Sequence, residues 1–66
     1  MPVAKIIEIS AESKESFEDA IRQGIRQAAK TVKHIKRAWV ADQLVEIDED
    51  TITNFRVHLK VTFVLD

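Results

Sequence analysis

The sequence predicts an α+β fold in which a strand, a helix and two further strands follow one another along 66 residues. Three observations lead to this prediction: a short β-branched segment near the N-terminus, one long amphipathic segment with helical spacing, and a C-terminal segment whose apolar and polar residues alternate. The last two strands can pair as a hairpin. A single helix can then cover one face of a three-stranded antiparallel sheet.

The first strand is expected over residues 3–9, which are rich in β-branched side chains and are followed by a polar segment. The helix is expected to begin at Ser13, because a serine hydroxyl can accept hydrogen bonds from the free amides of a first turn. Gly24 lies inside the apolar stripe and costs a helix about 1 kcal/mol relative to Ala. We therefore expect a strand to approach the helix closely at this position. The stripe comprises Phe17, Ala20, Ile21, Gly24, Ile25, Ala28, Ala29 and Val32.

The second and third strands are expected over residues 35–47 and 54–65, on either side of an acidic turn. The alternation of the second strand changes near Asp42 and Gln43, which predicts a β-bulge or a strong bend. The third strand has the cleanest alternation in the chain. Its apolar face comprises Phe55, Val57, Leu59, Val61, Phe63 and Leu65.

Length and composition favour a single domain over residues 1–66 that works only as part of a homo-oligomer. A chain of this size buries only about 60% of the surface that its unfolded form exposes. It contains no cysteine for disulfides, and its two histidines, His34 and His58, are too far apart in the sequence to suggest a zinc site. Strands of 13 residues would span about 43 Å and a helix of about 19 residues about 28 Å, so the strands would overhang the helix.

Several functional classes are not expected. A net charge of −1 gives no electrostatic reason for nucleic-acid binding. No segment has the apolar length of a membrane span, and the first residues lack the features of a signal peptide, so we expect a cytoplasmic protein that does not enter a membrane. No nucleophile with a base, and no glycine-rich phosphate loop, suggests an enzyme. The acidic run over residues 46–50 is interpreted as a solvated turn, since calcium needs several oxygens around one point.

The order and spacing of five segments together resemble the dodecin family. They are Val-Ala-Lys-Ile-Ile-Glu-Ile, Ser-Lys-Glu-Ser-Phe-Glu-Asp-Ala-Ile, Ala-Ala-Lys-Thr-Val, Ala-Trp-Val-Ala-Asp-Gln and Asn-Phe-Arg-Val-His-Leu-Lys-Val-Thr-Phe. The resemblance implies a β-α-β-β unit with its sheet partly wrapped around the helix, and assembly into a hollow homododecamer. It also implies binding of riboflavin or FMN in pairs between subunits, for storage and protection rather than turnover.

The resemblance also implies a flavin site. In the family, a tryptophan on the second strand stacks on the isoalloxazine ring, and a glutamine on the third strand binds its polar edge. This sequence has Arg37 and Arg56 at those two positions, and Trp39 follows two residues later, on the same face of the strand. The expected flavin-binding residues are therefore Trp39 as the stacking group, Arg37 and Arg56 as donors to the flavin or its phosphate, and Asp42 and Gln43 at the polar rim.

Each of these residues also has a structural interpretation: Trp39 as an interface aromatic, the arginines as ion-pair partners, and Asp42 with Gln43 as a bulge. Three hypotheses follow. The first is a flavin storage shell. The second is a shell without flavin that acts as a scaffold or holds another anionic ligand or a metal. The third is a dimeric interaction module that pairs through strand edges.

Overall fold

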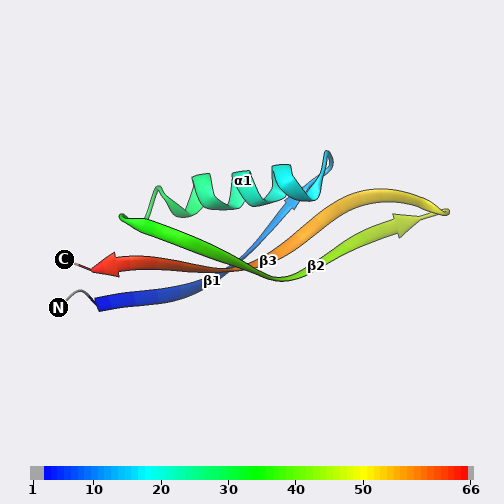
Figure 1. The fold of residues 1–66 in the computed structure, drawn as a ribbon. Coiled ribbons are helices and arrows are strands. Elements are labelled where there is room, and N and C mark those ends of the chain that lie inside the picture. Colours follow the sequence, from blue (N-terminus) through cyan, green and yellow to red (C-terminus); the bar gives the residue numbers. More distant parts are fainter. Residues whose placement is uncertain (1–2, 66) are drawn as a thin grey trace.

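The computed structural model describes residues 3–65, which form one helix and three strands (Figure 1). In chain order these are β1 (Val3–Ser13), α1 (Phe17–Ala28), β2 (Ile35–Asp48) and β3 (Thr51–Leu65). Strand β3 lies in the centre of the sheet and pairs antiparallel with both β1 and β2. The predicted α+β fold with β-α-β-β order is therefore confirmed.

The hydrophobic core lies between α1 and the face of the sheet that α1 covers. Val57, Leu59 and Val61 of β3 are fully buried against Ala20 of the helix, as the alternation of the third strand predicts. The expected close approach at Gly24 is also confirmed. A Cβ atom at this position would lie 3.0 Å from the Cβ of Ala11 in β1.

Strand β1 continues to Ser13, and the prediction that it ends at residue 9 is wrong. The segment after residue 9 contains polar residues of the kind found in turns. Its residues nevertheless pair with β3, with Ser10 opposite His58 and Glu12 opposite Arg56. A neighbouring strand that supplies hydrogen bonds and side-chain partners overrides the weak local preference of these residues for a turn.

The helix begins later than the sequence indicates, because Ser16 and not Ser13 is its N-cap. The hydroxyl of Ser16 accepts a hydrogen bond from the backbone N–H of Asp19, at 3.0 Å. Ser13 is buried at the end of β1, where its hydroxyl donates to the carboxylate of Asp19 and accepts from the N–H of Glu15. Both serines therefore stabilise the entry into the helix, but only Ser16 caps it.

The helix is also shorter than expected. It ends at Ala28, where the next amides bond three residues back, from Lys30 to Gln27 and from Thr31 to Ala28. Twelve residues of helix span about 18 Å, whereas the 14 residues of β2 span roughly 46 Å. The expected overhang is therefore larger than predicted, and the β2–β3 hairpin projects well beyond the helix (Figure 1).

Candidate functional site on the outer face of the sheet

The sheet face that turns away from α1, called the outer face below, carries mostly polar residues from all three strands. Residues directly opposite one another in antiparallel strands share a face. In β3 the buried core residues have odd numbers, so the even-numbered residues and their partners lie on the outer face. These partners include Glu8, Ser10 and Glu12 of β1 and Arg37, Trp39, Asp42 and Leu44 of β2.

A β-bulge at Ala41 decides which predicted site residues share this face. The register shifts between Val40 and Asp42, as predicted, so that these two residues lie opposite the consecutive residues Leu59 and His58. Asp42 therefore lies on the outer face with Trp39 and Arg37. Gln43 lies opposite Val57, on the face that α1 covers, so Asp42 and Gln43 do not lie side by side at one rim.

Trp39 is the largest exposed apolar group on the outer face, with 65% of its surface accessible. The ammonium group of Lys60, on the neighbouring strand, lies 5.0 Å from the centre of the indole ring, which is a cation–π distance. Arg37 lies two residues away on the same strand and face. Within residues 3–65 it forms no ion pair, so its guanidinium remains available.

Arg56, by contrast, is held between two carboxylates. Its Nη2 donates to the Oε1 atoms of Glu12, at 2.8 Å, and of Glu46, at 3.2 Å. The Nδ2 of Asn54 donates to the same two oxygens, at 2.6 and 3.0 Å. The hydrogen bond and charge of Arg56 hold the pKa of Glu12 below its ordinary value, and Glu12 in turn raises the pKa of Arg56. With two carboxylates and one guanidinium, this cluster has a net negative charge.

His58 is also paired within the chain. Its Nε2 lies 2.9 Å from the Oε1 of Glu8, and its Nδ1 lies 3.5 Å from the hydroxyl of Ser10. The hydrogen bond with His58 lowers the pKa of Glu8. The sequence contained no signal for these pairs, because Glu8, Glu12 and Glu46 reach their partners only through the pairing of strands that are far apart in the chain.

The predicted site residues thus fall into two groups on the outer face. Trp39 and Arg37 lie near Lys60, while Arg56 is four residues further along β3, which corresponds to about 13 Å. Asp42 lies between them, opposite His58. A ligand on Trp39 would therefore meet Arg37 and Lys60 before it reached the cluster at Arg56.

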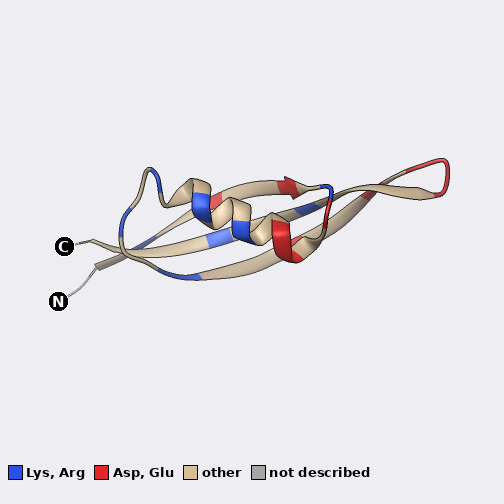
Figure 2. Ribbon diagram, turned by 90° about the horizontal axis from the view of Figure 1, so that it is seen from above, with Lys and Arg blue, Asp and Glu red and all other residues tan. Residues whose placement is uncertain are grey.

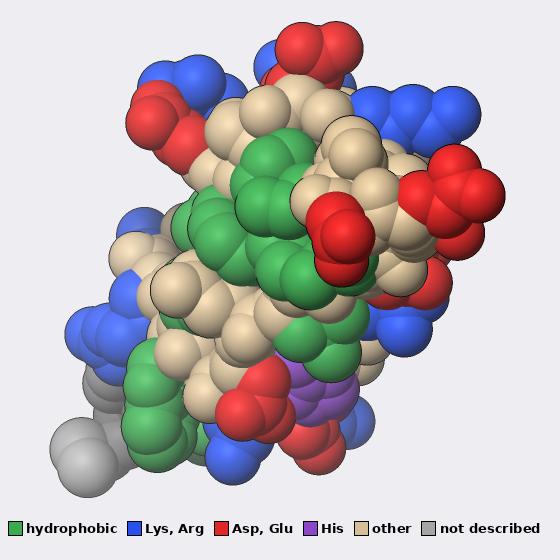
Figure 3. All heavy atoms as spheres, turned by 90° about the vertical axis from the view of Figure 1, so that its right-hand side faces the viewer, with side chains coloured by type: hydrophobic (Ala, Val, Ile, Leu, Met, Phe, Trp, Pro, Cys, Tyr) green, Lys and Arg blue, Asp and Glu red, His purple; other side chains and the backbone are tan. Residues whose placement is uncertain are grey.

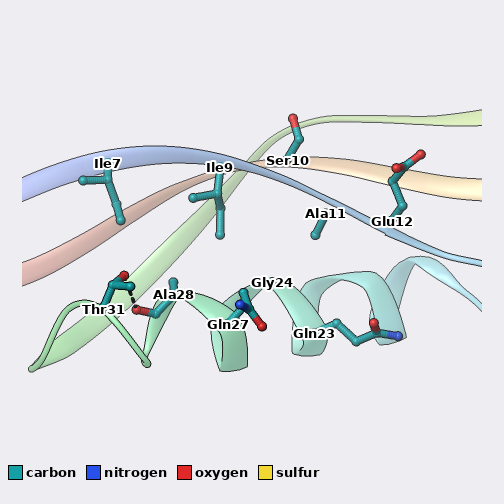
Figure 4. A pocket seen from close by; sticks show the side chains of 10 residues that line it. All are labelled: Ile7, Ile9, Ser10, Ala11, Glu12, Gln23, Gly24, Gln27, Ala28 and Thr31. Carbon is teal, nitrogen blue, oxygen red and sulfur yellow. Dashed lines mark hydrogen bonds between the residues drawn. The ribbon is translucent and has the colours of Figure 1, made fainter.

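Two hollows within residues 3–65 lie away from Trp39. One, of about 440 Å³, is a groove between the edge strand β1 and α1, and its walls include Ile7, Ile9 and Ala28 (Figure 4). The other, of about 560 Å³, has Glu12 and Glu46 among the residues that line it. Trp39 lines neither of these two hollows, and its indole is mostly exposed.

Two further properties concern residues 3–65 as a whole. No cluster of three or more His, Asp or Glu residues in this range could hold a metal ion. No helix in the same range is long and apolar enough to cross a membrane.

Comparison with known proteins decides the family. The dodecin family model matches residues 3–66. The chain belongs to the dodecin family. Among solved structures, this dodecin is similar to a variant of the Thermus thermophilus dodecin, with 30% identity, coverage of 100% of this chain and 98% of the other, and a TM-score of 0.94.

Two other solved structures widen the comparison. The dodecin of Streptomyces davaonensis is 28% identical, with coverage of 98% and 96% and a TM-score of 0.93. A protein of Mycobacterium tuberculosis, described as a calcium-chelating antigen and calcium dodecin with a novel calcium-binding site, is 30% identical, with coverage of 97% and 91% and a TM-score of 0.84. No curated protein matches the chain.

Proposed function

We propose that this dodecin assembles into a cytoplasmic homododecamer that binds riboflavin or FMN and sequesters it without turnover. The observation that carries the proposal is the indole of Trp39, which is 65% exposed on the outer face. A large flat aromatic group in that position either stacks on a ligand or packs against another subunit. Its place two residues after the stacking position of the family favours the ligand.

The charges around Trp39 suit a flavin that carries a phosphate. Lys60 lies over the indole, and Arg37 is free on the same face within the described chain. Two carboxylates of this face are engaged by other partners, Glu8 by His58 and Glu12 by Arg56, and Asp42 lies three residues further along β2 than Trp39, opposite His58. A phosphate near Arg37 would therefore meet positive charge, and arginine matches the geometry of phosphate oxygens.

The site is completed by a second subunit in this proposal. Small-molecule sites usually bury 70–90% of their ligand in a concave pocket. In one chain the indole of Trp39 is 65% exposed, and Trp39 lines neither of the two hollows described above. Binding between subunits gives the ring a second wall, and it couples ligand binding to assembly.

The test is a fluorescence titration of riboflavin and FMN with wild type, Trp39→Ala and the control Leu44→Ala. Leu44 is an exposed apolar residue on the same strand and the same face. Stacking on an aromatic side chain contributes about 1–3 kcal/mol, so Trp39→Ala should weaken binding roughly 5- to 150-fold. Native mass spectrometry on the same samples reports assembly. Unchanged flavin affinity in a fully assembled Trp39→Ala protein would assign the indole to packing alone.

A second candidate is a dodecin shell that holds no flavin and acts as a scaffold or binds another anionic ligand. The pairing of Arg56 favours it. Arg56 occupies the position of the flavin-binding glutamine, but it directs its donors to Glu12 and Glu46. It has no acceptor to offer the polar edge of a flavin.

Arg56→Gln separates the two candidates. The substitution restores the family residue and removes the cation that holds the two carboxylates. Tighter riboflavin binding by Arg56→Gln than by wild type would show that Arg56 excludes the usual flavin pose. A colourless shell in both proteins, even after addition of riboflavin and FMN, would favour the scaffold.

A further inference from the structure

The tip of the β2–β3 hairpin is acidic and exposed. It consists of Asp48, Glu49 and Asp50, called the acidic tip below, and none of the three forms an ion pair within residues 3–65. Directly behind it, Ile47 and Ile52 lie opposite each other and are 63% and 50% exposed. Figure 3, viewed from this side, shows acidic and apolar side chains together. Residues 43–55 contain no basic residue.

The acidic tip has a backbone conformation that Glu49 does not favour. Asp48 pairs with Thr51, and the two residues between them have positive φ, 49° for Glu49 and 63° for Asp50. A two-residue hairpin turn with two positive φ angles prefers Asn, Asp and Gly, so Asp50 tolerates this conformation, whereas the longer side chain of Glu49 is strained in it. The sequence thus places a glutamate where Asn, Asp or Gly would relieve the strain. A contact made by the carboxylate of Glu49 would account for that choice.

The opposite end of the molecule is basic. Lys5 of β1, Lys30 and Lys33 of the segment after α1, and Lys36 of β2, called the basic end below, are all exposed. Figure 2 shows Lys and Arg at this end and Asp and Glu at the hairpin tip. The segments that build the basic end, residues 3–7, 29–41 and 61–65, contain no acidic residue.

The basic end also carries exposed apolar groups. Val3 and Leu65 lie opposite each other at the ends of β1 and β3, and Ile6 follows on β1. Among residues 3–65, both ends therefore combine apolar surface with charge of one sign, and Asp66 follows Leu65 in the sequence. The longest dimension of the chain is 52 Å, far beyond the distance of about 8 Å over which exposed charges act at physiological ionic strength. The two ends cannot neutralise each other within one chain.

We propose that the acidic tip of one subunit docks on the basic end of a second copy, head to tail. This inference rests on the proposed homododecamer and names one of its contacts. The lysines of the basic end face the carboxylates of the acidic tip, while Ile47 and Ile52 cover the apolar groups beside Lys5. A head-to-tail contact joins different surfaces of two identical chains, and it closes into rings when the rotation between neighbours allows. Such rings are building units for a closed shell.

The first experiment separates docking from turn stability. Glu49→Asn with Asp50→Gly supplies the turn sequence that the backbone prefers and removes two carboxylates. The chain concentration at which half of the assembly dissociates is measured by mass photometry or sedimentation. We expect this concentration to rise about tenfold, the effect of losing two exposed charge pairs. An assembly as stable as wild type, or more stable, would mean that these two carboxylates make no contact that holds the assembly together.

The second experiment is a charge-swap cycle. Asp48→Lys with Glu49→Lys reverses two of the three charges of the tip, and Lys33→Glu with Lys36→Glu reverses two of the four charges of the basic end. Each pair of changes alone puts the new side chains against residues of like charge and should weaken assembly. In the protein with all four changes the two new lysines can pair with the two new glutamates, which should recover part of the lost assembly. If the protein with all four changes loses as much assembly stability as the two pairs of changes lose separately, with no recovery, the docking arrangement is wrong. None of the four residues is in the proposed flavin site, so flavin titrations of the assembled proteins serve as the control.

The outcomes also distinguish this inference from the proposed function. A wild type that assembles and binds flavin, with no recovery in the charge-swap protein, rejects only the docking contact. A wild type that is monomeric at micromolar concentration rejects the shell and the contact together. If assembly recovers in the charge-swap protein but wild type binds no flavin, the docking contact stands and flavin storage is rejected.

Discussion

Gly24→Ala is expected to destabilise the protein, although it replaces glycine in the middle of a helix. The new Cβ would lie 3.0 Å from the Cβ of Ala11 and 3.2 Å from the Cδ1 of Leu59. Carbon atoms in favourable contact are about 3.5–4.0 Å apart. The Cβ of Ala11 is bonded directly to the backbone of β1, so it cannot move without the strand. Helix and strand must therefore separate.

Two opposing effects determine how much stability Gly24→Ala loses. Alanine is favoured over glycine inside a helix by about 1 kcal/mol. An additional methyl group in a well-packed core costs about 1–3 kcal/mol, and the contact at Gly24 places this substitution in the upper part of that range. We expect a net loss of about 1–2 kcal/mol. For a domain of this size, each kcal/mol lowers Tm by roughly 4–8 °C.

The assay is thermal unfolding followed by circular dichroism at one fixed chain concentration, since the Tm of an oligomer depends on concentration. The matched control is the double variant Ala11→Gly with Gly24→Ala, which removes the facing Cβ. It should recover part of the Tm lost in Gly24→Ala. If Gly24→Ala is instead more stable than wild type by about 1 kcal/mol, the gain expected from helix propensity alone, the close-packing argument is refuted.

Three further predictions concern the helix cap, the ion pairs and the core. Ser16→Ala removes the acceptor for the N–H of Asp19 and should cost about 1 kcal/mol in denaturant unfolding; no change would contradict the assignment of the cap. Because Arg56 depresses the pKa of Glu12, the stability from this pair is present above the ordinary glutamate pKa and should decline as pH falls below about 4.3. Arg56→Gln should flatten this decline in acid-unfolding curves, and an unchanged slope would show that the pair is not coupled to folding. Leu59→Ala should cost about 2–5 kcal/mol because Leu59 is fully buried, and a loss below 1 kcal/mol would mean that α1 moves in to fill the space.

The element types and their order followed from periodicity, because side-chain spacing is a local property. The apolar stripe through Ala20 and Gly24 predicted a helix, and the alternation of residues 54–65 predicted the buried face of β3. Gly24 even indicated the close approach of a strand. The boundaries were less predictable. The end of β1 and the choice between Ser13 and Ser16 as N-cap depend on contacts with β3 and Asp19, which local preference does not include.

The candidate site shows the same division. The sequence and its resemblance to dodecins selected Trp39, Arg37, Arg56, Asp42 and Gln43 and predicted the bulge near Asp42. Only the tertiary structure decided that Gln43 turns to the other face, and that Arg56 is held by Glu12, which is 44 positions away in the sequence. The physical reason is register. A shift by one residue exchanges the two faces of a strand, and register arises from pairing between distant segments.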